Sequence, residues 1–328
     1  MTLGSLATRV GCSIAAVLSA VAIAAMVAVP RPARADSIAA DSTTDVACAT
    51  STRQVPTTWY VPSTPPLGLV WLQHGFVEGK FVWSAFATEL ANSGYLVMAT
   101  TLPTVHPLGC TLEHLIDNTG FLDNIADVFA HKDDPNGALA SSLAAATSDL
   151  GRTVPPLPEK LVFVGHSAGV EAVEYVAERL HSAYPATFSQ LRGIISEDGV
   201  KSFIGSNTDK ALAGLATTTL PIYATASPHL LCNAFRSGTR ALERYLPNRA
   251  FLGVKVTTGA HGDALGMSSP GYENLVCGRP KPANVAAVWG LTRGWITDMF
   301  AGTITADFYP GGSYYTDLLD SGTITTLP

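Results

Sequence analysis

The chain has 328 residues, of which 47% are hydrophobic and only 14% are charged, and its formal net charge is −6. An acidic chain is poorly suited to nucleic acid or an anionic membrane as its main partner, because both repel negative charge. The length is sufficient for one large buried core.

The first 35 residues predict a secretory signal peptide. Arg9 precedes an almost unbroken apolar stretch from residue 14 to residue 29, and the small-x-small site Ala33-Arg34-Ala35 follows. The alternative is an uncleaved membrane anchor, but this stretch is shorter than the ~20 residues that a spanning helix needs. We expect a secreted or cell-envelope protein with no membrane span after cleavage.

Cleavage would leave a more acidic chain with four cysteines. Removing residues 1–35 takes away three arginines and no acidic residue, so the net charge falls from −6 to −9. Cys48, Cys110, Cys232 and Cys277 remain, and none forms a C-x-x-C pair, which argues against a zinc or redox site. An even number of cysteines outside the cytoplasm indicates two disulfides, for which three pairings are possible.

The remaining chain alternates predicted strands with predicted helices, after a polar segment at residues 36–45 that we expect to be loose. Short apolar runs predict strands at residues 57–61, 67–73, 95–100, 161–164, 191–196, 221–226 and 251–257. Helical spacing of apolar residues predicts helices at 82–93, 118–130, 137–150, 170–183, 208–216, 236–245 and 283–300. This alternation predicts one α/β domain over residues 36–328, with a mostly parallel sheet covered by helices on both faces. Residues 301–328, poor in helix formers, are expected to form an extended tail or hairpin packed on this domain.

Two segments early in the domain bear on a site. The strand at 67–73 runs into His74-Gly75-Phe76, an exit that would bring backbone N–H groups close to a nucleophile; the alternative is merely a tight turn. Acyl transfer uses two such donors to hold an oxyanion, each contributing about 3 kcal/mol, and Phe76 N–H is our first candidate. The segment at 103–158 is either a partial lid or a helical crossover, and we favour the crossover.

The motif Gly165-His166-Ser167-Ala168-Gly169 lies between a predicted strand and a predicted helix. In that context G-x-S-x-G is typical of a nucleophile elbow, and a purely structural turn is the alternative. Its glycines fit a turn too tight for side chains on either side. The turn would lift the Ser167 hydroxyl out of the sheet edge, and the helix N-terminus behind it favours developing negative charge. Ala168 N–H is the second candidate oxyanion donor.

A general base is expected after the last strand, where Gly259-Ala260-His261-Gly262-Asp263 places His261. His229 follows a strand end and is the rival base. Asp263 is too close to His261 in sequence to orient the ring from behind, so we expect it to stabilise the loop.

The carboxylate that would orient the base is less obvious. The exit of the strand at 221–226 offers none, whereas the preceding strand ends in Glu197-Asp198-Gly199. Asp198 is our choice and Glu197 the second. In the alternative interpretation, Asp198 only caps the loop that follows it.

Together these residues resemble the α/β-hydrolase superfamily, in particular secreted actinobacterial esterase- or lipase-like hydrolases. The resemblance covers residues 52–300. It rests on the H-G loop, G-H-S-x-G, the late G-x-H-x-D, and the stretches 284–288 and 294–299 near the terminal helix. It implies a serine hydrolase without cofactor or metal that acts on carboxylic esters, with a small-molecule or lipid ester as substrate. The chain departs from the superfamily's commonest pattern at the acid.

Neighbouring strand exits are close in such a fold, so we predict a Cys232–Cys277 disulfide, and Cys48–Cys110 by elimination. The predicted function is ester hydrolysis through Ser167, His261 and Asp198. Amide, thioester or peracid chemistry on the same residues is one alternative, and a secreted binding protein without turnover is another. Nothing in the sequence indicates the oligomeric state.

Overall fold

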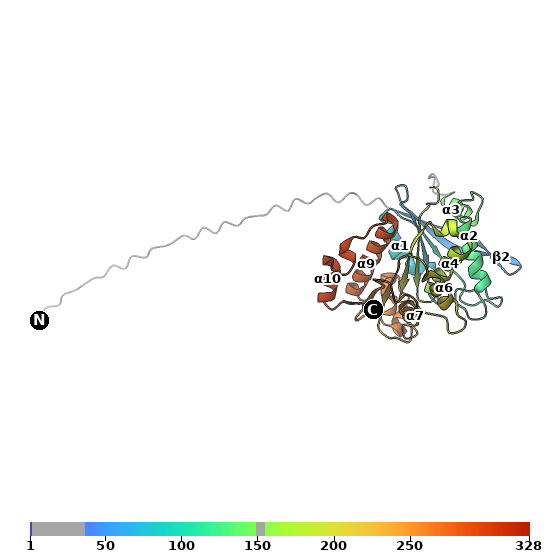
Figure 1. The fold of residues 1–328 in the computed structure, drawn as a ribbon. Helices are drawn as coiled ribbons and strands as arrows, with labels where there is room; N and C mark the ends of the chain where they lie inside the picture. The colour runs from blue at the N-terminus through green and yellow to red at the C-terminus, as the bar shows by residue number, and fades with distance from the viewer. Residues whose placement is uncertain (2–36, 149–154) are drawn as a thin grey trace. The chain divides into compact units, whose positions relative to one another are not determined.

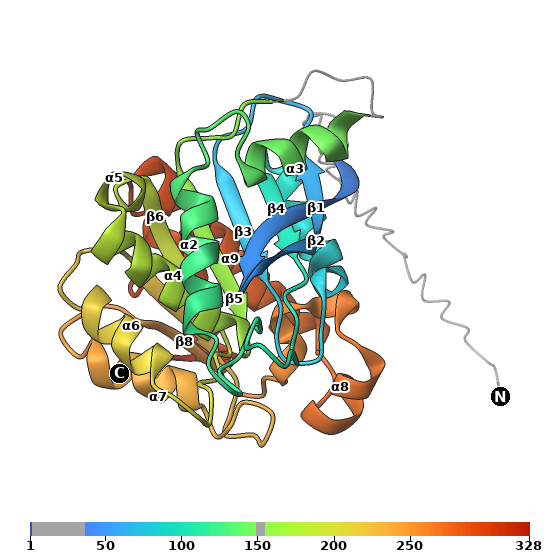
Figure 2. The same cartoon turned by 90° about the vertical axis from the view of Figure 1, so that its right-hand side faces the viewer.

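A nine-stranded sheet forms the centre of the structure (Figures 1 and 2). The computed structural model describes Met1, residues 37–148 and residues 155–328, so the predicted signal peptide lies outside the described residues apart from Met1. The strand order across the sheet is β1-β2-β4-β3-β5-β6-β7-β8-β9. The strands are β1 Ile38–Cys48, β2 Ser51–Val61, β3 Leu69–Gln73, β4 Leu96–Thr100, β5 Leu161–His166, β6 Leu191–Glu197, β7 Ile222–Ala226, β8 Gly253–Val256 and β9 Ile324–Thr326.

The middle of the sheet is parallel and its edges are antiparallel. Strands β4, β3, β5, β6, β7 and β8 run in one direction, while β2 opposes β4, β1 opposes β2 and β9 opposes β8. The seven strands predicted from apolar runs are all present. The expected α/β architecture with a mostly parallel sheet is therefore confirmed.

Helices cover both faces of the sheet, as Figure 1 shows for α2, α4 and α6 on one side and α9 and α10 on the other. Alternate residues of a strand point to opposite faces of the sheet, so there are two hydrophobic cores. Trp71 of β3 packs in the first core, together with residues of α2, α3, α4, α6 and α7. Val70 and Leu72 pack in the second core, together with residues of α1, α9 and α10. The helices are α1 Ser84–Asn92, α2 Thr119–Ala130, α3 Ala138–Thr147, α4 Gly169–Ala183, α5 Pro185–Phe188, α6 Asn207–Leu215, α7 Ser237–Tyr245, α8 Gly271–Cys277, α9 Pro282–Ala301 and α10 Ser313–Asp320, with short 3₁₀ turns η1 Lys80–Trp83, η3 His261–Ala264, η4 Gly266–Ser268 and η5 Ala306–Phe308. No helix in the described part of the chain is both long and apolar enough to cross a membrane.

The chain changes direction between β3 and β5. It leaves β3 toward β4 on one side and then returns across the sheet to β5 on the other, with α2 and α3 on the way. Phe121 and Leu139 of these helices are buried in the core, so the segment around them is a crossover, as favoured. Ligands of such sheets bind at the carboxyl ends of the strands beside this kind of switch point.

Residues 36–45, expected to be loose, belong mostly to strand β1, and that expectation was wrong. β1 pairs with β2 along its whole length. Val46 and Cys48 of β1 join the first apolar core, but Thr44 is polar and hydrogen bonded. Its hydroxyl lies 2.9 Å from the Thr57 hydroxyl and 3.0 Å from that of Ser142 on α3. Hydrogen bonds here replace the apolar contacts on which the strand prediction relied.

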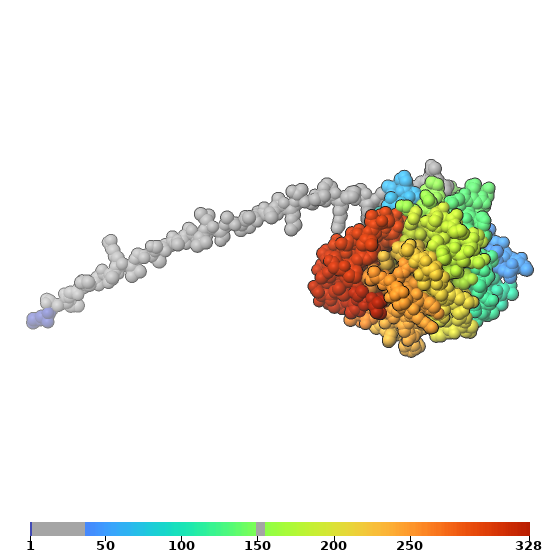
Figure 3. All heavy atoms as spheres, in the orientation of Figure 1, coloured from blue at the N-terminus to red at the C-terminus, as the bar shows by residue number. Residues whose placement is uncertain are grey.

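The expectation of an extended tail over 301–328 was also wrong in part, because the segment contains helix α10 as well as strand β9. Tyr315 of α10 is fully buried and its hydroxyl lies 2.7 Å from that of Thr326 on β9. The C-terminal segment, red in Figure 3, packs directly against the orange residues that precede it. Tertiary contacts thus overrode the weak helix propensity of this segment.

Two disulfides join distant segments. Cys48, at the end of β1, is bonded to Cys110 in the loop before α2. Cys232, in the loop after β7, is bonded to Cys277 at the end of α8.

Candidate active site

Ser167 occupies a strained turn between β5 and α4. Its φ of 54° lies in the left-handed region, which residues other than glycine adopt at a cost. A Cβ atom on Gly169 would lie 2.4 Å from the His74 carbonyl oxygen, and one on Gly165 would lie 2.6 Å from that of Gly169. Helix α4 therefore begins directly against the exit of β3, which only glycine permits.

Hydrogen bonds from the neighbouring strand fix this turn. Ser167 N–H donates to the Glu197 carbonyl at 3.0 Å, and the Ser167 carbonyl accepts from Val170 N–H at 3.1 Å and Val200 N–H at 3.0 Å. Ser167 itself is largely buried on this anchored backbone, with 7% of the residue exposed.

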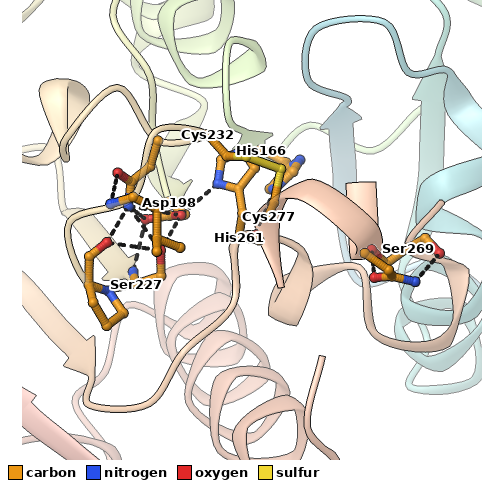
Figure 4. The surroundings of a disulfide bond; sticks show 11 residues. His166, Asp198, Ser227, Cys232, His261, Ser269 and Cys277 are labelled. Carbon is orange, nitrogen blue, oxygen red and sulfur yellow. Dashed lines mark hydrogen bonds and ion pairs between the residues drawn. A yellow bond between two sulfur atoms is a disulfide. The ribbon is translucent and has the colours of Figure 1, made fainter. Parts of the chain in front are cut away.

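Asp198 and His261 form a buried pair beside this turn (Figure 4). Asp198 follows β6 and His261 opens the 3₁₀ turn after β8. His261 Nδ1 lies 2.6 Å from Asp198 Oδ2. A cavity of only about 10 Å³ adjoins the pair, which leaves room for no more than about one water molecule.

Ser227 and Asn233, which the sequence analysis did not single out, support Asp198. Ser227 donates from its N–H at 2.8 Å and from its hydroxyl at 2.5 Å, and Asn233 Nδ2 donates at 3.2 Å. Burial alone would raise the pKa of Asp198, but the hydrogen bonds from His261 and Ser227 lower it. A sequence signal for these donors did exist. The exit of β7 lacks a carboxylate but carries Ser227 and Asn233, which lie next to Asp198, the carboxylate that follows β6.

Glu197, the second choice, has no contact with His261. Its carboxyl accepts hydrogen bonds from the hydroxyls of Thr225 and, at 2.6 Å, Thr292. Burial raises the pKa of Glu197 to about 7 against the effect of these two bonds. The rival base His229 is exposed. Asp263 accepts Ala260 N–H at 2.9 Å and Lys281 N–H at 3.3 Å, so it bonds within its own region.

His261 lies beside His166, the residue before Ser167, but no hydrogen bond joins the His261 ring to the Ser167 hydroxyl. Among the described residues, the Ser167 hydroxyl makes no hydrogen bond. The His261 ring is centred 4.7 Å from the ring of His166, the residue before Ser167. Catalytic hydrogen bonds are often long in the absence of substrate and tighten in the reacting complex.

The two candidate oxyanion donors lie on either side of Ser167. Ala168 follows it in sequence, and Phe76 follows Gly75, where an added Cβ would lie 2.7 Å from the Ser167 Cβ. Neither Phe76 N–H nor Ala168 N–H donates a hydrogen bond to another described residue. Both are therefore available to an acceptor next to the nucleophile.

Within the part of the chain that the structure describes, two groups of side chains have ligand atoms close enough for a metal ion, but their chemistry does not fit one. Cys48 and Cys110, near His106, are already joined as a disulfide. His166, His261 and Glu273 form the second group. Both nitrogens of His166 and Nδ1 of His261 are hydrogen bonded, which leaves fewer than the three protein ligands of an ordinary catalytic zinc site.

The most spacious cavity described, about 830 Å³, lies away from this site. Leu191, Pro221 and Tyr223 line it, at the opposite ends of β6 and β7 from Glu197 and Ala226. It contains none of the residues discussed above, so we assign it no part in the chemistry.

Comparison with solved structures identifies the fold. Ferulic acid esterase from Streptomyces cinnamoneus superposes with a TM-score of 0.57 at 15% identity, over 92% of this chain and 99% of that one. A Klebsiella pneumoniae protein whose structure carries the name dienelactone hydrolase gives 0.51 at 14% identity, over 80% and 98%. This chain has the α/β-hydrolase fold. No family model and no curated protein matches it.

The raised pKa of buried Glu197 predicts that the free energy of unfolding depends on pH. Its folded pKa of about 7 exceeds the ordinary value of 4.5, so the unfolded chain ionises first. Stability contributed by the bound proton is full below about pH 4.5 and is lost as the pH rises toward 7. Glu197→Gln removes this dependence, so its melting temperature relative to wild type should rise between about pH 4 and pH 8.

Thermal unfolding at the two pH values measures this change. Glu159→Gln, an exposed control, should show no comparable rise. An equal offset for Glu197→Gln at both pH values would contradict the prediction.

Proposed function

We propose that this protein is a secreted serine hydrolase that cleaves carboxylic esters through an acyl-enzyme. The observation that carries the proposal is the buried Asp198–His261 hydrogen bond, 2.6 Å long, beside the strained turn of Ser167. The two structural neighbours, named for an esterase and a dienelactone hydrolase, support ester chemistry at the level of reaction class.

The proposed mechanism uses the hydrogen bond between His261 and Asp198. Asp198 accepts the Nδ1 proton of His261, which leaves Nε2 free to take the Ser167 proton as the hydroxyl attacks an ester carbonyl. The N–H groups of Phe76 and Ala168 hold the oxyanion. His261 then protonates the departing alcohol, and a water molecule activated by the same ring releases the acid.

Export of the protein is part of the proposal. It is supported by the signal-peptide pattern of residues 1–35 and by the two disulfides, since such bonds persist in oxidising compartments.

An apolar substrate is supported by exposed side chains that follow the strands at the sheet edge where Ser167 lies. Large apolar side chains are exposed in the segments that follow five parallel strands, all of which end at this edge of the sheet. They include Phe76 and Val77 after β3, Ile116 after β4, Phe203 and Ile204 after β6, Leu231 and Phe235 after β7, and Met267, Leu275 and Val276 after β8. Among the described residues, only Met1, Leu67 and Ile304 of this type are exposed elsewhere. Apolar groups gathered in this way are typical of a binding surface.

Ser167→Ala tests the nucleophile. The variant should fold and should lose ester hydrolysis by several orders of magnitude, since the attacking oxygen is gone. A fluorophosphonate probe should label the wild-type protein and not the variant. Retention of more than about a tenth of the wild-type turnover would rule Ser167 out, and a wild-type protein that is neither labelled nor active would favour a binding function.

Asp198→Asn tests the acid. It should lower kcat by roughly 10³–10⁴, because the asparagine no longer selects the reactive tautomer of His261. Glu197→Gln is the matched control and should have a much smaller effect on steady-state kinetics. The reverse ranking would give the role to Glu197, and two mild effects would place the acid elsewhere.

A panel of p-nitrophenyl esters tests the apolar surface. We expect kcat/KM to rise from acetate to octanoate, with each buried methylene contributing at most ~0.8 kcal/mol. Phe203→Ser combined with Leu231→Ser should lower the octanoate-to-acetate ratio at least about fivefold. Ile304→Ser is the control, because Ile304 is about as exposed (74%) as Phe203 (84%) and Leu231 (76%) but follows helix α9 instead of one of these strands. It should leave the ratio unchanged. Equal ratios in all proteins would contradict a role for these side chains.

A further inference from the structure

A second buried ion pair lies behind the site, and the mechanism above makes no use of it. Glu78 comes from the loop after β3, and His166 is the residue before Ser167. Glu78 Oε2 and His166 Nδ1 are 3.2 Å apart, and the two side chains are 4% and 0% exposed. Trp83 places its ring edge-on to that of His166, with centroids 6.3 Å apart. Such a pair is costly to bury unless other bonds complete it.

On one side, Glu78 holds the loop that carries the first oxyanion donor. The same oxygen that faces His166 accepts the Gly75 N–H at 2.5 Å. Between Gly75 and Glu78 stand Phe76, whose N–H is the proposed donor, and Val77, which has a left-handed φ of 59°. The Glu78 carboxylate therefore closes a short, strained loop onto itself.

On the other side, His166 holds the loop of the base. His166 Nε2 donates to the His261 carbonyl at 3.0 Å, while Nδ1 donates to Glu78. Carbonyl and carboxylate oxygens only accept, so both ring nitrogens carry a proton and His166 is an imidazolium. Burial alone would lower the pKa of His166, but the Glu78 carboxylate raises it well above its ordinary value. Burial would raise the pKa of Glu78, but His166 lowers it.

Helix α8 adds a third carboxyl to this cluster. Glu273 is 6% exposed, and one of its carboxyl oxygens lies within 4.8 Å of a ring nitrogen of His166 and of His261. Burial raises the pKa of Glu273 to about 8; the His166 cation opposes the shift, and the carboxylates of Glu78 and Asp198 add to it. A protonated Glu273 carries no charge and leaves the ion pair intact.

The neighbouring residue of α8 reaches the same loop. The Tyr272 hydroxyl donates to the Val77 carbonyl at 2.7 Å. Helix α8 thus contacts the loop of the first oxyanion donor and the ion pair behind it.

We propose that Glu78 and His166 are positioning residues for the ester hydrolysis proposed above, tying the oxyanion loop and the His261 loop to the Ser167 turn. The proposal rests on that proposed function. Their pair joins three loops, from β3, β5 and β8, that contribute to the reaction. Ionisation of Glu273 would place a second negative charge beside His166, which would compete with Glu78 and with the His261 carbonyl for its two protons.

Steady-state kinetics on a soluble p-nitrophenyl ester test the ion pair. Glu78→Gln should lower kcat by about 10–100-fold with KM changed less than about threefold, since the oxyanion donor acts mainly in the transition state. Glu174→Gln is the matched control, because Glu174 is also a buried glutamate, 1% exposed, on α4. It should leave kcat within about twofold of wild type. A Glu78→Gln protein with wild-type kcat, or with losses confined to KM and melting temperature, would overturn the proposal.

The pH profile of kcat tests the role of Glu273. Wild-type kcat should fall above about pH 8, where this carboxyl loses its proton. Glu273→Gln imitates the protonated acid at every pH, so the fall should move to higher pH or disappear. An unchanged alkaline limb would overturn the role of Glu273, and this profile alone decides if Glu78→Gln does not fold. Ser167→Ala in the same assay separates the two proposals: if wild type is active only through Ser167, unaffected Glu78 and Glu273 variants refute the positioning proposal alone.

Discussion

The turn at Ser167 is the constraint on which the rest of the site depends. A left-handed serine between two glycines persists only where its surroundings hold it, and here β3 and β6 do so from both sides. The close approach of α4 to the His74 carbonyl leaves no space for a side chain. Consequently the ends of β3, β5 and β6 are held in fixed positions relative to one another. The groups that would act on a substrate are attached to this one edge of the sheet.

The site contains two histidines that differ in their hydrogen bonding and therefore in their charge. His261 shares its Nδ1 proton with Asp198 and keeps the other nitrogen free, which suits a base. His166, in ring contact with it, uses both nitrogens as donors and is a fixed cation. The surrounding carboxyls divide accordingly: Asp198 has a lowered pKa, while burial raises that of Glu197. These side chains are buried, so their neighbours have a large effect on each charge state.

How much of this could be predicted from the sequence depended on the kind of signal. The strand–turn–helix context of Ser167 was readable because apolar periodicity and paired glycines are local. Strand β1 and helix α10 were missed, because hydroxyl contacts of Thr44 and burial of Tyr315 are tertiary. Glu78 was missed for the same reason, since nothing near it in the chain indicates that it meets His166. Ser227 lies in a strand exit without a carboxylate, but only the fold shows that this exit meets Asp198.

The polar strand β1 also has a consequence for how the sheet ends. An edge strand presents unpaired backbone groups to any passing chain, which makes flat apolar edges prone to aggregation. On β1 the exposed positions include Asp41 and Asp45, and the opposite edge, β9, is only three residues long. A second sheet that docked against β1 would meet two carboxylates, and one against β9 would find few groups to pair with. The acidic side chains of this edge strand thus oppose growth of the sheet beyond the molecule.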